Sequence, residues 1–339
     1  MRVPRPSMSP ALRSLVVRAY LRLLALDGRP IVLGPWRSEL GFEILYWLPF
    51  LNWALKRYGI SPDRCIALSR GGMGRLYPAK EAVDLYTLRT VDQVRLENQV
   101  DYETRKILKQ TSVTTWDRQI AAEAVEKVYG KGQRYHLLHP SWMYWLFDPA
   151  WNEKVPLSFV AKHAEFLPLP VPDLPKGLEL PKAFVAVRFY ERHTYALHEP
   201  VVKMTREMVQ GLASKFPVVL LNQQTCFDDH VDLPLTGPNI FALPQMAPSE
   251  NLLLQAAVLA RCQAFVGTYG GVAQWALRYR KPTLSCYTQF TGTAFCHRNL
   301  SQVLAAQMSV PFEMLDLRAV KLWKAALGPV VDIPEAVAV

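Results

Sequence analysis

Residues 261–287, RCQAFVGTYGGVAQWALRYRKPTLSCY, have the pattern of a strand, a glycine turn, a helix and a second strand. The apolar run Ala264–Val266 is broken by the segment GTYGG at 267–271, and Val272–Tyr279 then has the composition of a helix. A Lys-Pro pair ends that helix ahead of the β-rich run Thr283–Tyr287. This order is typical of α/β domains with parallel sheets.

The glycine turn is a candidate anion site. Glycine lets the backbone approach a ligand closely, and the first N–H groups of the following helix have no partner within that helix. The helix dipole adds a positive field at the same end, so phosphate groups bind there readily. An ordinary tight turn is the alternative, because the turn is neither a Walker A loop nor a G-x-G-x-x-G loop. The candidate anion-binding residues are Gly267, Thr268, Tyr269, Gly270 and Gly271.

The composition predicts a folded chain of two domains. Of its 339 residues, 50% are hydrophobic and 20% are charged. A run of 18 apolar residues and a signal-peptide pattern are both absent from the sequence, which favours a cytoplasmic protein. The five cysteines are scattered and odd in number, which favours buried thiols over disulfides. Cys286 and the neighbouring Cys296-His297 pair match no known metal-site spacing, so no metal is expected.

Half of the net charge of +10 lies near the N-terminus, since residues 1–30 hold six arginines and one aspartate. A basic balance of this kind is compatible with nucleic acid, an anionic membrane surface or a phosphorylated substrate. Residues 1–29 are predicted to form a basic tail and an amphipathic helix, whose apolar stripe is Leu12, Leu15, Val16, Ala19, Leu23 and Leu26. Such a helix either lies in a membrane interface or docks on the body of the protein.

A second glycine loop, GPWRSELGFE at 34–43, follows the apolar strand Pro30–Leu33 and precedes a helix over Ile44–Tyr58. It carries Trp36, Arg37 and two carboxylates, Glu39 and Glu43, which share a helix face if the helix begins early. Glutamates are also common in a first helical turn because the dipole favours them there.

A third loop has a glycine cluster between arginines. Arg70-Gly71-Gly72-Met73-Gly74-Arg75 follows the predicted strand Cys65–Ser69, and it is either a phosphate cradle or a flexible loop.

The alternation of strands and helices predicts two Rossmann-like α/β domains with parallel sheets, at 30–166 and 183–339. The linker is 167–182, where five prolines exclude regular structure. Residues 80–130 are predicted to be largely helical, the aromatic segment 142–151 to fill a core, and 315–327 to form a helix. Further polar residues near predicted strand ends or at a helix start are His139, Arg188, His193, Asp229 and Glu250.

The second half resembles the nucleotide-sugar domain of GT-B glycosyltransferases, in an order similar to the fucosyltransferase-like branch. The resemblance rests on a strand ending in Arg188, a helix start at Ser249-Glu250, and the run Ala264–Gly271 ahead of Lys281-Pro282. The loop 34–43 looks like the opening loop of uncharacterised bacterial polysaccharide glycosyltransferases. The resemblance implies two sheets facing across a cleft.

The resemblance also implies transfer of a hexosyl or related sugar from a nucleotide sugar to a glycan or glycolipid hydroxyl, with inversion and without metal or cofactor. Arg188, Glu250 and the glycine turn would bind the donor. Glu39 and Glu43 are candidates for the catalytic base, with Asp229 and His193 in reserve. The remaining acceptor or cleft candidates are Trp36, Arg37, His139 and His193.

Two rival readings remain open. A sugar-nucleotide epimerase of the same fold is one, and a non-catalytic basic binding protein is the other. Nucleic acid is not expected as a partner, because no recognisable nucleic-acid module is present. Peripheral attachment to an anionic membrane through the N-terminal helix is compatible with a glycosyltransferase.

Overall fold

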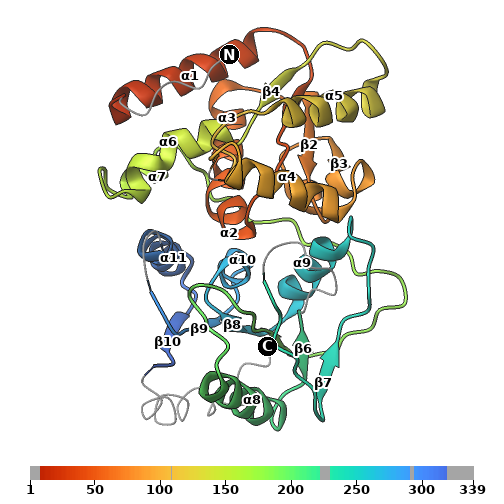
Figure 1. The fold of residues 1–339 in the computed structure, drawn as a ribbon, viewed down its shortest axis with the longest axis vertical. Coiled ribbons are helices and arrows are strands. Elements are labelled where there is room, and N and C mark those ends of the chain that lie inside the picture. The colour runs from red at the N-terminus through yellow and green to blue at the C-terminus, as the bar shows by residue number, and fades with distance from the viewer. Residues whose placement is uncertain (1–7, 108, 222–229, 291–293, 319–339) are drawn as a thin grey trace. The chain divides into compact units, whose positions relative to one another are not determined.

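The computed structural model describes residues 8–107, 109–221, 230–290 and 294–318. Their contacts divide the chain into two units, coloured from red to blue along the chain in Figure 1. The first unit comprises Met1–Asp173, Gln245–Ala257 and Cys296–Leu300. The second comprises Leu174–Pro244, Val258–Phe295 and Ser301–Val339. The predicted domains 30–166 and 183–339 are continuous stretches, whereas each unit is assembled from three.

The first unit is built on a four-stranded parallel sheet with the order β3-β2-β1-β4. Its strands are β1 (Ile31–Leu33), β2 (Cys65–Ser69), β3 (Glu81–Asp84) and β4 (His136–Leu138). Its helices are α1 (Pro10–Leu26), α2 (Leu40–Phe42), α3 (Leu48–Tyr58), α4 (Val91–Glu103), α5 (Thr115–Tyr129), α6 (Ser141–Trp151) and α7 (Ser158–Ala161). A π-helical segment, Glu43–Trp47, joins α2 to α3, so the helix predicted to start at Ile44 begins at Leu40.

The apolar periodicity of α5 places one of its faces on this sheet. Ile120, Ala121, Ala124 and Val125 are buried against a cluster that includes Val32 and residues of β2 and β3. Helix α6 is almost wholly buried, which confirms the core role predicted for the aromatic segment. The strand β3 was missed, because a largely helical pattern was predicted for 80–130.

The second unit is built on a six-stranded parallel sheet with the order β10-β9-β8-β5-β6-β7. Its strands are β5 (Val185–Arg188), β6 (Val218–Leu220), β7 (Ile240–Ala242), β8 (Ala264–Thr268), β9 (Thr283–Tyr287) and β10 (Phe312–Asp316). The helices of this half of the chain are α8 (Glu199–Ala213), α9 (Asn251–Arg261), α10 (Gly271–Arg278) and α11 (Ala294–Met308).

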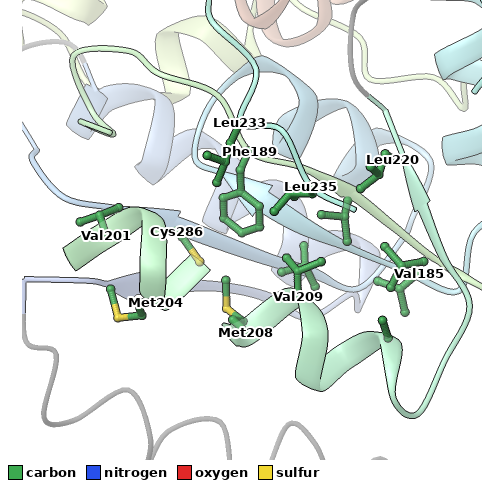
Figure 2. Close-up of a cluster of buried hydrophobic side chains, with 14 of the residues drawn as sticks. Val185, Phe189, Val201, Met204, Met208, Val209, Leu220, Leu233, Leu235 and Cys286 are labelled. Carbon is green, nitrogen blue, oxygen red and sulfur yellow. The ribbon is translucent and has the colours of Figure 1, made fainter. Parts of the chain in front are cut away.

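The core of the second unit lies between α8 and the sheet, as Figure 2 shows. Helix α8 contributes Val201, Met204, Met208 and Val209, which pack with side chains of the strands. The helix predicted over 315–327 is wrong at its start, since residues up to Asp316 pair with β9 as β10. The rest of that range, from 319 on, lies outside the described residues.

Two Rossmann-like α/β units with parallel sheets are therefore present, as the sequence predicted. Their arrangement across a cleft stays a prediction.

Candidate active site

The second unit has a topological switch point between β5 and β8. The chain runs from β5 through β6 to β7 on one side and then returns to pair β8 with β5 on the other. Ligands of parallel α/β sheets bind outside the carboxyl ends of the strands at such a point. Arg188, the last residue of β5, is there in register with Gly267 of β8.

Arg188 is a buried cation with unused hydrogen-bonding capacity. Its side chain is 2% exposed, and Nε donates to Oδ1 of Asp232 at 2.9 Å. Its guanidinium carbon lies 4.9 Å from the centre of the Tyr190 ring. Nη2 has no hydrogen-bond partner among the residues that the structure describes. A buried charged donor without a partner is costly, so this position favours an anionic ligand.

Part of the predicted glycine turn is strand. Strand β8 extends through Gly267 and Thr268, so the turn proper is Tyr269-Gly270. A Cβ on Gly267 would overlap the carbonyl oxygen of Arg188, which explains glycine at this strand position. The hydroxyl of Thr268 accepts from the amide of Tyr190 at 3.0 Å, so it ties down the loop after β5. Tyr269 is buried, and its amide donates to the carbonyl of Cys286 at 2.8 Å.

The N-terminus of α10 follows this turn directly. The amide of Gln274 makes the first intrahelical bond, to the carbonyl of Gly270 at 3.1 Å, and the amides of residues 271–273 precede it. A Cβ on Gly270 would overlap the Tyr190 hydroxyl and lie 3.1 Å from Nη1 of Arg192. Tyr190 and Arg192 were not predicted as site residues, although both lie on the loop that leaves β5. His193, which was predicted, is exposed on the same loop.

The first unit has its own switch point, between β1 and β4, where the loop 34–39 leaves the sheet. A Cβ on Gly34, whose φ is +138°, would overlap the carbonyl oxygen of Leu68. The amide of Trp36 donates to that same carbonyl at 2.8 Å. The loop is thus held close against β2 along its first residues.

Arg37 anchors this loop from within. Its side chain is 1% exposed and forms ion pairs with Asp101 and, at 3.1 Å from Nε, with Asp117. Burial alone would raise the pKa of Asp117, but His139 and Arg37 beside it hold that pKa well below its usual range. His139 is fully buried, with Nε2 3.3 Å from the Asp117 carboxylate.

Three residues predicted to line the acceptor side are therefore interior. Trp36 is fully buried and stacks on Trp47 and Tyr144 at centroid distances of 5.9 and 6.1 Å. Together with Arg37 and His139 it supports the loop, and none of the three is exposed in this unit. The interior position of Arg37 has a physical cause, because ion pairs with one aspartate of α4 and one of α5 hold its guanidinium inside the unit.

Glu39, in the same loop, has a partly exposed side chain. It is the N-cap of α2, yet its side chain makes no capping hydrogen bond, and 41% of that side chain is exposed. Lys109 Nζ lies 3.6 Å from its carboxylate and 3.3 Å from the centre of the Phe42 ring. Lys109 was not predicted as a site residue, since it lies 70 positions after Glu39 in the sequence. Glu39 is thus a partly exposed carboxylate next to a cation, and its role as a catalytic base stays a prediction.

Glu43 lies in a different environment from Glu39. It is fully buried at the start of the π-helical segment and accepts from Ser69 Oγ at 2.7 Å and Tyr77 Oη at 2.5 Å. Burial raises the pKa of Glu43 to about 7, against the lowering effects of Arg70 and its two hydrogen bonds. Its Oε2 has no hydrogen-bond partner within the described part of the chain. The fold leaves Glu43 no exposed surface for an acceptor.

The Arg70-Gly71-Gly72 loop is packed within the first unit. A Cβ on Gly71 would collide with the side chain of Leu252, and one on Gly72 with Leu253. The amide of Gly72 donates to Asp84, whose pKa burial raises to about 7. The loop therefore uses its glycines for packing, and one of its amides is already bonded to a carboxylate.

Two further predicted site residues are Glu250 and Asp229. Glu250 is exposed just ahead of α9, in the segment 245–257 that belongs to the first unit, whereas Arg188 belongs to the second. Asp229 lies outside the described residues. Among the described residues, no group of three or more His, Cys, Asp or Glu could hold a metal ion. Within the same ranges, no helix is long and apolar enough to cross a membrane.

Known proteins offer distant likenesses. No protein-family profile matches the chain, and neither does any curated protein. The iron-containing dodecameric glycosyltransferase TibC of enterotoxigenic E. coli H10407 is 11% identical with a TM-score of 0.40, over 80% of this chain and 61% of that one. This chain thus spans about three fifths of the length of TibC.

Two further solved structures match this chain over most of its length and over nearly all of their own. The E. coli heptosyltransferase WaaC, solved with ADP, is 13% identical with a TM-score of 0.38, over 90% of this chain and 100% of that one. SnogD, a glycosyltransferase of Streptomyces nogalater, is 13% identical with a TM-score of 0.36, over 87% of this chain and 98% of that one. All three of these structures are glycosyltransferases, the class that the sequence resembles, while the fucosyltransferase-like branch stays a prediction. Likenesses this distant carry no argument about activity.

Proposed function

We propose that this protein is a glycosyltransferase that moves a sugar from a nucleotide-sugar donor to a hydroxyl of a glycan or glycolipid acceptor. The observation that carries the proposal is the buried Arg188 at the switch point of the second unit, beside the N-terminus of α10. A buried cation whose Nη2 has no hydrogen-bond partner in the described part of the chain, together with a helix N-terminus, suits a diphosphate.

The proposed chemistry assigns a task to each unit. The acceptor oxygen forms a bond to the anomeric carbon while the bond from that carbon to the diphosphate oxygen breaks. Glu39 takes the proton of the acceptor hydroxyl, and the diphosphate leaves with the bonding electron pair. Arg188 and the amides at the start of α10 stabilise the negative charge that develops on the leaving group. Inversion and independence of metal, which the sequence resemblance implied, belong to the proposal.

Thermal shift against a panel of nucleoside diphosphates tests the donor assignment, because a ligand that binds only the folded state raises the melting temperature. At least one diphosphate is expected to raise it in the wild type. Arg188→Lys keeps the charge but loses the fork of donors, so it should weaken that diphosphate about tenfold or more.

Arg206→Gln provides the matched control. Arg206 is an exposed arginine of α8 in the same unit, and its loss should leave the shift unchanged. A panel without any stabilising diphosphate, or equal affinities in wild type and Arg188→Lys, would refute the donor site.

A further inference from the structure

Helix α1 docks on the first unit by a face other than the apolar stripe read from the sequence. The buried residues of α1 are Arg13, Val17, Leu21 and Leu24. The contacts run mainly to α6 and α3, and Figure 1 shows α1 in red alongside α6. The docking is specific, because Nη1 of Arg13 donates to Asp148 at 2.9 Å and to the carbonyl of Trp145 at 3.0 Å.

Two further polar contacts, one beside Arg13 and one about two turns later, fix the rotation of α1 about its axis. Ser14 Oγ lies 2.7 Å from Nε2 of His163, and the Tyr20 hydroxyl donates to the carbonyl of Leu137 at 2.7 Å. The outer face of α1 cannot turn inward without breaking these contacts.

That outer face is a strip of leucines. Leu12, Leu15, Leu23 and Leu26 are 40%, 62%, 50% and 79% exposed. Apolar side chains gathered on one exposed face of a helix mark an interaction site.

The charge beside the strip indicates the partner. Residues 1–26 hold five arginines and no acidic residue, and Arg13 is the only one of those described that is buried. Arg22 is exposed and lies four residues before Leu26, so it lines one edge of the strip, and the half-buried Arg18 lies one turn before it. A helix with exposed leucines flanked by arginines is suited to the interface of an anionic bilayer.

A second copy of this chain is a poorer fit for the same face. A two-fold contact through α1 would bring the arginines of both copies together, and α1 has no carboxylate to pair with them. We propose that the outer face of α1 binds the surface of an anionic lipid bilayer and holds the first unit there in a fixed orientation. This inference does not depend on the proposed transfer reaction.

Sedimentation of the full chain with vesicles tests the inference. Binding is expected to vesicles of phosphatidylcholine mixed equally with phosphatidylglycerol, and much less to phosphatidylcholine alone. Leu15→Ser combined with Leu26→Ser should weaken binding about tenfold for each leucine, since each loses most of its apolar contact with the acyl region. Arg22→Gln should weaken binding to the anionic vesicles about fivefold and leave the neutral ones unaffected.

Leu96→Ser is the matched control, because Leu96 is 60% exposed on α4 of the same unit. It should bind vesicles as the wild type does. Melting temperatures of all variants should agree, since exposed substitutions have small effects on stability. Failure of the wild type to sediment with anionic vesicles would overturn the inference. So would unchanged binding by the leucine pair, or a concentration-dependent dimer that only this pair abolishes.

Discussion

Glu39 and Glu43 are four positions apart in the sequence but lie in opposite environments. Glu39 is partly exposed at the start of α2, while Glu43 is enclosed and bonded to Ser69 and Tyr77. Glu39→Gln should therefore lower the transfer rate by about 10²–10⁴-fold and leave donor affinity unchanged, as expected for a catalytic base.

The control is Glu43→Gln, compared in donor affinity and transfer rate with an identified acceptor. A large loss of rate in Glu43→Gln with normal rate in Glu39→Gln would reverse the assignment.

Glu43 should also make the stability of the fold depend on pH. Its pKa rises from 4.5 to about 7 on folding because burial disfavours the charged form. Its contribution is fully present below about pH 4.5 and is lost as pH rises through 7, which amounts to roughly 3 kcal/mol. Urea unfolding of the wild type and Glu43→Gln across this range should show a flatter profile in the variant. Asp84 contributes in the same direction in both proteins. Parallel pH profiles of wild type and variant would show that Glu43 keeps its ordinary pKa in the folded state.

At the scale of elements, the turn between β8 and α10 depends on a glycine for steric reasons. The φ of Gly270 is 166°, an extended value open to any residue, but a Cβ there would overlap the Tyr190 hydroxyl. Gly270→Ala should thus destabilise the second unit by about 1–3 kcal/mol through overpacking.

Tyr190→Phe removes the overlapping oxygen, and the ring carbon that bore it is 3.5 Å from the added Cβ. The double variant should therefore recover most of the loss, as a double-mutant cycle by urea unfolding would measure. Additive effects of the two changes would contradict this packing explanation.

Local pattern was enough to predict most elements but not their partners. The strands at 65–69 and 283–287 and the helix after Gly271 follow from short apolar runs and glycine or proline boundaries. The apolar stripe of α1 was predicted from the sequence. Its docked face instead contains Arg13, whose contacts with Asp148 and the carbonyl of Trp145 no local pattern predicts. The interior position of Arg37 depends on aspartates 64 and 80 residues away. Contacts over such distances leave no local signal.

At the scale of the whole molecule, α1 belongs to the fold of the first unit as well as to its surface. Deletion of residues 1–28 would expose the surface that Val17, Leu21 and Leu24 cover and leave Asp148 without Arg13. We expect a loss of stability on the order of 5 kcal/mol from the apolar area alone. Urea unfolding followed by tryptophan fluorescence should show an earlier transition in the truncated chain. A truncated protein with the wild-type midpoint would show that α1 adds little to the core.

The first unit also depends on residues far along the chain. It includes segments 245–257 and 296–300, where Leu252 and Leu253 pack on the Gly71-Gly72 loop and Nδ1 of His297 lies 2.8 Å from the Tyr46 hydroxyl. During synthesis, the ribosome must add 127 more residues after Asp173, counted to Leu300, before this unit is complete. At about 5–20 residues per second that delay lasts roughly ten seconds. Throughout it, the nascent first unit exposes the surfaces that those segments later cover.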